Sequence, residues 1–459
     1  MRERVAQYHE PNPLDLLFFA NEAAGRRARL APGHIHLATE VEGELDIGRL
    51  QHAVAALHRV YPVTASRLEL CPWTGRPHWR LDVPPTDPRR VVRIHELQPP
   101  TRTQFRAEYE RLLAAPIDAT RHAPLQFHIF HGLPPGDILV LRWPHALMDA
   151  RGGGMMSEEL DRLYEEVPDF SALSSAGDES RIDFQPLLAR VPPGRRVQML
   201  AQALVKSDWH RKRYAQLATE PIPADPGALR CVFRHVSPDD TRGILEHALR
   251  IGGVGRFPDF LRACALWALH EIMPHPVPPD ALYTTLNLLD RRNRRQPLRW
   301  CCNLTSALPI AVPAGLVQDR QRAADLVREQ TGRYLASDTP RQHAAVLWLL
   351  TRLPTAWLGA AIKTRLSPGR RVTPRLGVAP APSLPLGLMG PTTRPMTTYC
   401  GRRLLNYYGC RPPLPDTGFA IEANLTTDRL NLTGVCYERR VPVAMLTALI
   451  DRLVVALRE

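Results

Sequence analysis

The stretch Leu139-Val-Leu-Arg-Trp-Pro-His-Ala-Leu-Met-Asp-Ala-Arg-Gly152 joins a buried strand to two side chains that can carry chemistry. Its apolar first half is typical of a strand, and Pro144 ends the pattern. His145 follows at once, and Asp149 stands four residues later. An imidazole at the exit of a buried strand, with a carboxylate nearby, is typical of a general base and the group that orients it.

A glycine run, Gly152 to Gly154, separates this motif from a helical pattern that extends from Met155 to Val167. Because glycine adopts positive φ and has no Cβ, we expect the backbone to approach a substrate closely at this run. The N-terminus of the helix predicted to begin near Met155 would point at the site and favour developing negative charge.

Outward from the motif, the first half of the chain alternates between strand and helix patterns. Residues 34–43 alternate in hydropathy and predict a strand. Residues 46–61 carry apolar side chains at helical spacing, and Asp46 is placed to cap that helix. Residues 125–130 and 137–143 are separated by a segment rich in Pro and Gly, which predicts a hairpin just before the motif.

The second half repeats these element types, which indicates a pseudo-duplicated architecture. It ends in a predicted hairpin of residues 419–425 and 429–437, followed by an amphipathic helix. Residues 168–196 are polar and rich in Pro, Ser and Gly, which indicates a linker or crossover. We therefore expect an α/β protein of two domains, residues 1–180 and residues 181–459.

The chain is strongly basic, and nearly all of its basic side chains are arginine. It has 459 residues and a formal net charge of +13, while lysine occurs only at Lys206, Lys212 and Lys363. This usage is typical of a high-GC genome. The alternative is a positive field that attracts coenzyme phosphates, an acidic carrier protein or anionic lipid. The arginines are scattered and form no basic arm, which argues against nucleic acid as a partner.

The eight cysteines form no CxxC pair, which predicts reduced thiols in a cytoplasmic protein. The adjacent Cys301 and Cys302 are interpreted as packing residues, since no activating base is evident. His34 and His36 share one face of a predicted strand, but no third ligand stands at metal spacing, so we expect no metal site. The first residues lack the apolar core of a secretory signal, and no apolar run is long enough to predict a membrane span.

The motif and the order of elements resemble the condensation-domain superfamily of acyltransferases, which includes chloramphenicol acetyltransferase, plant BAHD acyltransferases and bacterial wax ester synthase/diacylglycerol acyltransferases. Its HHxxxDG motif corresponds to Pro144-His145-Ala-Leu-Met-Asp149-Ala150. Pro13-Leu-Asp15 resembles the opening of the family, and Asn287-Leu-Leu-Asp-Arg291-Arg292 resembles a segment of its second lobe, so the resemblance covers nearly the whole chain. Pro144 replaces the first histidine and Ala150 the glycine, whereas the second histidine, the one tied to chemistry, is kept as His145.

The resemblance implies a two-lobed sandwich similar to chloramphenicol acetyltransferase, with a tunnel between the lobes. His145 would be the general base, because a neutral imidazole can take a proton near neutral pH. Asp149 would turn away from the substrate and pair with an arginine of the second lobe, which fixes the loop that includes Gly152. Arg291 is the expected partner of Asp149, and Arg292 is the alternative.

Three further residues are expected to line the tunnel: Trp143, Arg151 and Asn303. No permanently bound cofactor is expected, and acyl-CoA or a phosphopantetheinyl thioester would be the co-substrate. The apolar segment Val346-Leu-Trp-Leu-Leu350 is interpreted as core, with peripheral docking on the inner membrane as the alternative.

The expected function is transfer of an acyl group from a thioester to a hydroxyl or an amine, with O-acyl transfer favoured. The nearest members of the family would be stand-alone wax ester synthase-like enzymes of lipid metabolism or acyltransferases of secondary metabolism. Expected partners are a small-molecule acceptor and acyl-CoA or an acyl carrier protein. The alternatives are a stand-alone amide-forming condensation enzyme, a non-catalytic condensation-like recruitment module and a basic protein that binds nucleic acid or anions.

Overall fold

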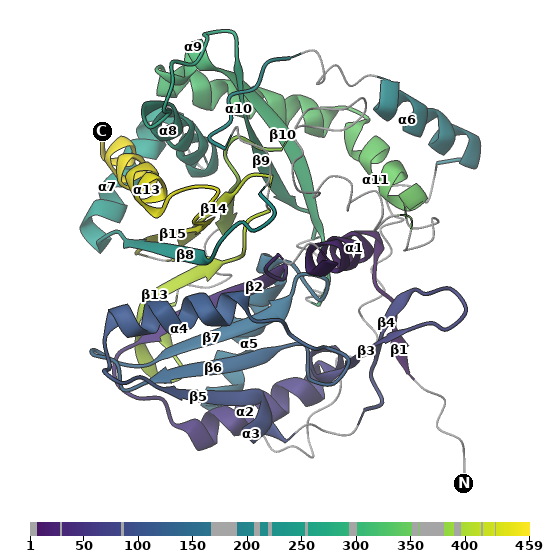
Figure 1. Ribbon diagram of the computed structural model, residues 1–459, viewed down its shortest axis with the longest axis vertical. Coiled ribbons are helices and arrows are strands. Elements are labelled where there is room, and N and C mark those ends of the chain that lie inside the picture. Colours follow the sequence, from purple (N-terminus) through teal and green to yellow (C-terminus); the bar gives the residue numbers. More distant parts are fainter. Residues whose placement is uncertain are drawn as a thin grey trace.

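The computed structural model has two lobes, drawn one above the other in Figure 1, with helix α1 (Pro13–Arg27) beside their junction. The mixed α/β class and the two-lobed architecture expected from the sequence are confirmed. The structure describes residues 7–27, 30–83, 87–166, 191–205, 212–218, 223–252, 256–292, 301–350, 357, 381–389, 396–414, 416–426 and 428–459.

A six-stranded sheet forms the centre of the first lobe. β7 (Ile138–Pro144) lies within it between β2 (His34–Val41) and β6 (Gln126–His131), and every residue of β7 is buried. β7 is antiparallel to both neighbours, so the predicted strand and hairpin are confirmed. The sheet is completed by β5 (Val92–Glu96) next to β6, and by β13 (Arg402–Cys410) and β12 (Thr398–Tyr399) beyond β2.

β12 and β13 come from the second half of the chain but lie in the sheet of the first lobe. β13 pairs antiparallel with β2, with Cys410 opposite His36, and Figure 1 shows it entering the lower lobe from above. The expected boundary at residues 180 and 181 lies outside the described residues, and β13 shows that a single cut does not separate the lobes. A local hydropathy pattern does not encode which distant strand will pair with which, and this pairing corrects the expected division.

Helices cover both faces of the first-lobe sheet. α2 (Ile47–Val60) and α5 (Ala150–Glu166) pack on one face, around the buried Trp143. α4 (Arg102–Ala114) packs on the other face, which also contacts strands of the second lobe. Because side chains alternate along a strand, Arg142 points to the α4 face while Trp143 points to α2 and α5. Asp46 caps α2 as predicted, since its carboxylate accepts a hydrogen bond from the Arg49 N–H at 2.9 Å.

The rest of the first lobe is a small arm and two short helices. The arm is a three-stranded sheet that stands out beside the main sheet in Figure 1. Its strands, in spatial order, are β1 (Tyr8–His9), β4 (Pro77–Arg80) and β3 (Arg67–Leu70), and the short helices are η1 (Pro62–Ala65) and α3 (Pro88–Val91).

The second lobe is built on a four-stranded sheet and a two-stranded ribbon. The predicted C-terminal hairpin is confirmed as β14 (Phe419–Leu425) and β15 (Leu430–Tyr437), which pair antiparallel. α13 (Val443–Arg458) packs against β15 so closely that a Cβ on Gly434 would lie 2.5 Å from Ile450. The other strands are β11 (Leu386–Met389), β8 (Leu229–His235), β9 (Leu282–Asp290) and β10 (Thr305–Pro313), and the other helices are α6 (Pro193–Val205), α7 (Pro238–Gly252), α8 (Phe257–Glu271), α9 (Ala314–Val317), α10 (Arg320–Ala336) and α11 (Thr339–Leu350).

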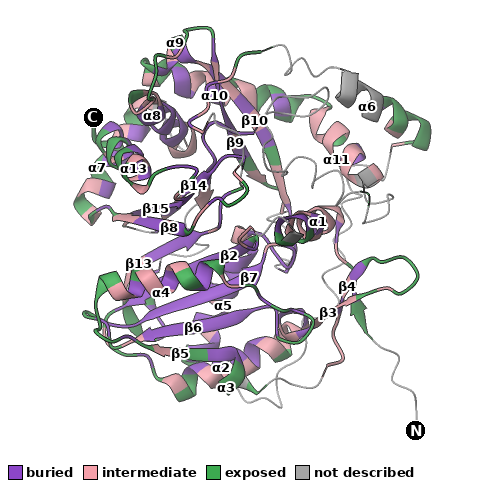
Figure 2. Cartoon of the chain, in the orientation of Figure 1, coloured by how far each residue is buried: buried purple, intermediate pink, exposed green. Residues whose placement is uncertain are grey.

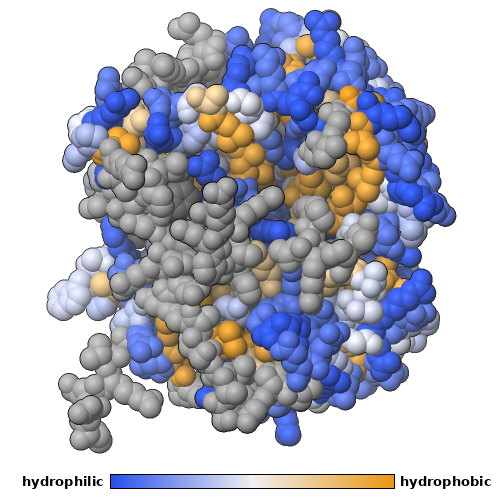
Figure 3. Space-filling view, turned by 180° about the vertical axis from the view of Figure 1, so that it is seen from behind, coloured by the Kyte–Doolittle hydropathy of each residue, from blue (hydrophilic) through white to orange (hydrophobic). Residues whose placement is uncertain are grey.

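Burial follows this layering. The central strands of both sheets are buried in Figure 2, while the outward faces of the helices are exposed. In the view from behind, hydrophilic residues cover most of the described surface, with hydrophobic patches on the upper lobe (Figure 3). Among the described residues, no helix combines the length and the apolar character needed to cross a membrane.

Candidate active site

His145 stands at the exit of β7, where the two lobes meet. The strand ends at Pro144, and a tight turn closes with a hydrogen bond from the Leu147 N–H to the Pro144 carbonyl at 2.8 Å. The His145 N–H donates to the carbonyl of Gly33, just before β2, at 3.1 Å. From the second lobe, Asn303 Nδ2 donates to the His145 carbonyl at 2.7 Å. The main chain of His145 is therefore held on both sides, and its ring is left for other contacts.

The ring of His145 is partly buried and lies against α1. It stacks on Phe18 with 3.5 Å between ring centroids and 13° between planes. Nδ1 is buried and has no hydrogen-bond partner among the described residues. Burial lowers the pKa of the imidazole to about 4, and the positive charge of Arg411 acts in the same direction. His145 is thus a neutral imidazole at pH 7, which is the form that accepts a proton.

Asp149 serves as a structural link between the lobes. Within its own lobe, Asp149 Oδ1 accepts from the Gly152 N–H at 2.8 Å, and its carbonyl accepts from the Gly153 N–H at 3.0 Å, so it caps α5. From the second lobe, the Leu304 N–H and the Thr305 hydroxyl each donate to Oδ2 at 2.9 Å. Burial by itself would raise the pKa of this carboxyl, but Arg292 and these donors lower it below its usual value. Asp149 is therefore ionised and fully bonded.

The arginine that pairs with Asp149 is Arg292 and not Arg291, which corrects the first choice made from the sequence. Arg292 Nη1 and Nη2 lie 3.1 and 2.8 Å from the two carboxylate oxygens, and the side chain is 3% exposed. The Arg291 N–H donates to the Leu304 carbonyl, and the charge of Arg291 acts on Tyr334 of α10. Two adjacent residues in extended backbone point to opposite sides, so only one of them can reach Asp149.

A buried polar network at the start of α1 was missed in the sequence. Asn12 Oδ1 accepts from the Asp15 N–H at 3.0 Å, and Asp15 Oδ2 accepts from the Asn12 N–H at 2.7 Å, in the manner of a capping box. Asp15 Oδ1 accepts from Asn303 Nδ2 at 2.7 Å, and the same amide nitrogen donates to the His145 carbonyl. Burial raises the pKa of Asp15 to about 8, although these N–H groups act against it. The Asn12-to-Asp15 spacing signals a helix start, but nothing local signals Asn303.

Solved structures that superpose on the whole chain share this arrangement of lobes. The first condensation domain of the calcium-dependent antibiotic synthetase matches with a TM-score of 0.67 and 16% identity, covering 99% of this chain and 96% of that chain. Trichothecene 15-O-acetyltransferase from Fusarium sporotrichioides matches with a TM-score of 0.67 and 12% identity, covering 98% and 95%. Polyketide synthase associated protein 5 from Mycobacterium tuberculosis matches with a TM-score of 0.63 and 15% identity, covering 99% of each. The chain has a condensation-domain fold.

No protein-family model and no curated protein matches the chain. At these levels of identity the superposition establishes the condensation-domain fold and leaves the chemistry to the residues of this chain.

The three expected tunnel residues occupy different places in the condensation-domain fold. Asn303 is buried beside His145 at the junction of the lobes. Arg151 is partly buried on the first turn of α5, and its charge acts on Tyr407 of β13. Trp143 is fully buried in the core under α5, on the face of the sheet away from α4 and the second lobe. Strand alternation directs its ring into the core, so Trp143 supports the site from below and is not an accessible residue at the junction.

The glycine run lies inside a helix, which corrects the expectation that glycine serves there to adopt positive φ. α5 begins at Ala150, so Gly152 to Gly154 form its first turns, and none of them has positive φ. The reason for glycine is a close approach, because a Cβ on Gly153 would lie 2.1 Å from the Trp143 ring. Asp149 caps α5 and so sets the residue at which the helix begins. The hydropathy pattern does not show this start, because the first turns contain the glycine run.

Gly153→Ala is expected to lower the free energy of unfolding by about 1–3 kcal/mol, because overpacking against Trp143 outweighs the better helix propensity of alanine. Urea denaturation measures the change. Gly243→Ala in α7 is the matched control, since no atom lies within 4 Å of a Cβ there, and it should stabilise by about 0.5–1 kcal/mol. Equal effects of the two substitutions would contradict this account of Gly153.

Cysteines and metal ligands add no chemistry to the described part of the site. All eight cysteines are free, and burial raises the pKa of the Cys301 thiol to about 12 and raises the pKa of the Cys302 thiol well above its usual value. Neither thiol is thus a thiolate at neutral pH. Within the described residues, no group of three or more His, Cys, Asp or Glu is arranged to hold a metal ion.

Proposed function

We propose that the protein is an acyltransferase that moves an acyl group from a thioester to a hydroxyl or an amine, with His145 as the general base. The observation that carries this proposal is the neutral imidazole of His145 at the junction of the lobes, held through its main chain and through Phe18. Asp149 is ruled out as the base because its carboxylate is ionised, buried and saturated by five hydrogen bonds.

The reaction requires the transfer of one proton, from the acceptor to the leaving thiolate. Nε2 of His145 accepts the proton of the acceptor as its oxygen or nitrogen attacks the thioester carbonyl carbon. The C–S bond then breaks, and the imidazolium returns the proton to the departing thiolate, which leaves as a free thiol. General base catalysis contributes about 10²–10⁴-fold to such a step, and the two lobes would supply the rest by holding donor and acceptor together.

Donor and acceptor are proposed from the same chemistry. The donor is acyl-CoA or a carrier-bound phosphopantetheinyl thioester, and a hydroxyl acceptor is favoured over an amine. A wax ester or secondary-metabolite product, made in the cytoplasm or on the inner face of the membrane, fits these choices.

Product analysis tests the proposal. The full chain is incubated with a series of acyl-CoAs and an acyl carrier protein thioester, together with long-chain alcohols, diacylglycerol and amines. Mass spectrometry is expected to find an ester or amide, and a thiol reagent to find free thiol in equal amount. If no thioester is consumed with any acceptor, the proposal is wrong. The protein would then be a recruitment module, an alternative that the replacement of the first motif histidine by Pro144 favours.

The activity should have an unusually acidic lower limit. Only the unprotonated imidazole accepts a proton, and a pKa of about 4 keeps it unprotonated through neutral pH. kcat/KM is therefore expected to stay level as the pH falls to about 5 and to decline as the pH falls through about 4. Phe18→Leu opens the ring to water, which should raise the pKa of His145 towards its ordinary value and move this limit to higher pH. A wild-type limit near pH 6.5 that Phe18→Leu leaves in place would contradict the assignment.

A further inference from the structure

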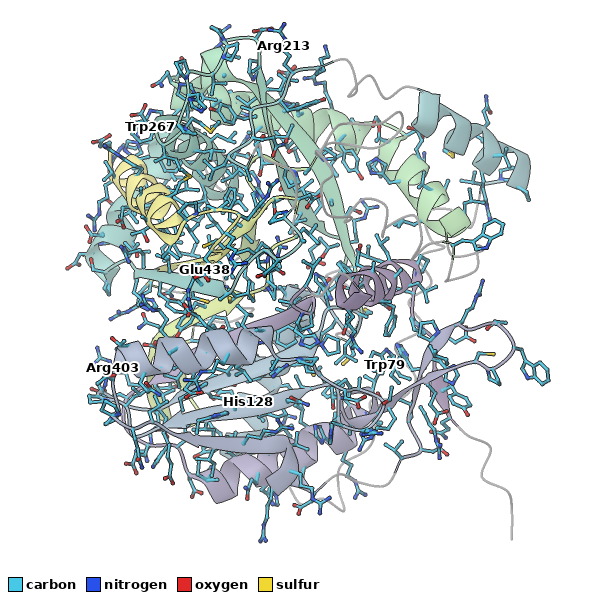
Figure 4. All side chains as sticks on the ribbon, in the orientation of Figure 1. Trp79, His128, Arg213, Trp267, Arg403 and Glu438 are labelled. Carbon is cyan, nitrogen blue, oxygen red and sulfur yellow. The ribbon has the colours of Figure 1, made fainter. Side chains whose placement is uncertain are left out.

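A second group of polar side chains is buried in the first-lobe sheet, on the face that α4 covers. His36 of β2 lies opposite Arg142 of β7, which in turn lies opposite Gln126 of β6. His34 lies opposite Pro144, two pairs closer to the active site on the same face of the sheet. His34 and His36 are fully buried and Arg142 is 2% exposed. Figure 4 labels the nearby His128 on the same sheet, well inside the lower lobe.

Arg142 carries a positive charge that no carboxylate of the described chain balances. Its Nη2 donates to the Ala115 carbonyl at 2.5 Å and lies 3.2 Å from His34 Nδ1, while its Nε has no hydrogen-bond partner among the described residues. Burial lowers the pKa of Arg142 to about 10, and the charge of Arg93 adds to this effect. A guanidinium keeps its charge at neutral pH even so, and a buried charge without a counter-charge is strongly unfavourable.

Arg262 of α8 is a buried arginine that, unlike Arg142, has a carboxylate acting on it. It is equally buried at 2% exposed, and burial lowers its pKa to about 10 as well. There, however, the carboxylate of Asp259 acts on the guanidinium and favours its charged form. The carboxylate nearest to the cluster around Arg142 is Glu22, which is paired with Arg26 at 2.5 Å and lies 3.5 Å from the far nitrogen of His34.

The neighbours of Arg142 also leave hydrogen-bonding atoms unused. Both ring nitrogens of His36 and Nε2 of His128 are buried without a partner among the described residues. The Tyr109 ring of α4 stands edge-on to the His36 ring, with 5.6 Å between centroids. More than 90% of buried polar groups in native proteins are satisfied, so three such atoms close to a guanidinium that has no paired carboxylate among the described residues point to a site for a polar group.

The partner must be an anion that accepts several hydrogen bonds. Burial lowers the pKa of His36 and of His128 well below the usual value, so both rings are neutral and each offers one N–H. A carboxylate matches one guanidinium flanked by N–H donors, because its two oxygens can accept from all of them.

We propose that Arg142, with His36, binds a carboxylate group of the substrate. Arg142 lies near the end of β7, three positions before His145, so the two residues are on the order of 10 Å apart along the chain. The inference rests on the proposed function in one respect, namely that the carboxylate belongs to the molecule that His145 acts on. The anion site itself is independent of turnover.

Anion binding is measured on the full chain without any thioester. Sodium acetate and inorganic phosphate are titrated at constant ionic strength, with the melting temperature and the shifts of ¹³C-labelled histidine rings as readouts. Acetate is expected to raise the melting temperature and to move two buried histidine signals, which His34→Gln and His36→Gln variants assign. Arg142→Met should weaken acetate binding by about tenfold or more, and Arg262→Met, the matched buried arginine, should leave it unchanged. If Arg142→Met does not fold, His36→Leu should still weaken acetate several-fold.

Three results would overturn the site. They are no response of the wild type to acetate, an equal response of Arg142→Met, and a stronger response to phosphate than to acetate. The substrate assignment is tested separately with acceptors of equal length that carry or lack a terminal carboxylate. Arg142→Met should raise the KM for the carboxylate-bearing acceptor relative to the KM for the acceptor that lacks it. Acetate binding without any thioester turnover would support the anion site and contradict the acyltransferase activity. Failure of the anion site and failure of the proposed function can therefore be distinguished.

Discussion

His145→Ala is expected to lower kcat by about 10²–10⁴-fold, because the reaction loses its general base while the substrate contacts remain. The fold should survive, since the main-chain hydrogen bonds of His145 to Gly33 and Asn303 do not involve the ring. The loss in stability is limited to the stacking contact with Phe18. The rate of thiol release from the thioester measures activity, and thermal unfolding measures the fold.

His58→Ala is the matched control for this substitution. His58 of α2 also has its pKa lowered to about 4 by burial, but its ring contacts Phe127 in the core, away from the junction of the lobes. The His58→Ala variant should keep kcat within a few-fold of wild type. Should His145→Ala retain the wild-type rate, the base lies elsewhere and the central claim about the site fails.

Asp149→Asn is expected to cost about 3–5 kcal/mol of unfolding free energy and most of the activity. The substitution keeps the shape of the side chain but removes the buried, bidentate counter-charge of Arg292, which is 3% exposed and keeps only the more exposed carboxylate of Asp290 at 3.1 Å. It also loosens the contact between the turn that holds His145 and the strand β10 of the second lobe. Urea denaturation gives the stability change, and thiol release gives the change in rate.

Arg291→Met provides the control for the ion pair. Arg291 lies on the other side of the chain from Asp149, so its loss should change stability by about 0.5 kcal/mol or less. A large effect of Arg291→Met with a small one of Arg292→Met would reverse our assignment of the pair. The double variant Asp149→Asn with Arg292→Met should be more stable than the sum of the single changes predicts, because neither charge is left alone.

The pH dependence of stability gives a further check on Asp149. Its pKa is lowered below the usual 3.8 in the folded protein, so its contribution is present above pH 3.8 and is lost as the pH falls through the lower folded value. The difference in stability between wild type and Asp149→Asn should therefore persist down to about pH 4 and shrink at still lower pH.

Several features of this protein follow from short stretches of sequence. The motif strand, the hairpins and the cap of α2 by Asp46 depend on residues within a few positions of one another, and each is found where the sequence placed it. The position of His145 at the end of the central strand belongs to this group. Its ability to act as a base remains a prediction, because catalysis depends on what binds beside it.

Other features depend on contacts between distant parts of the chain, and only the tertiary structure decides them. β13 completes the sheet of the first lobe, Gly153 is required by the ring of Trp143, and Asn303 ties Asp15 to His145. The choice of Arg292 over Arg291 depends on which side of an extended segment faces Asp149, and a one-residue shift would reverse it. Local sequence determines secondary structure and the placement of the motif. Packing across the two lobes determines which side chains meet at the site, because a pattern along the chain holds no information about which distant segment will pack against it.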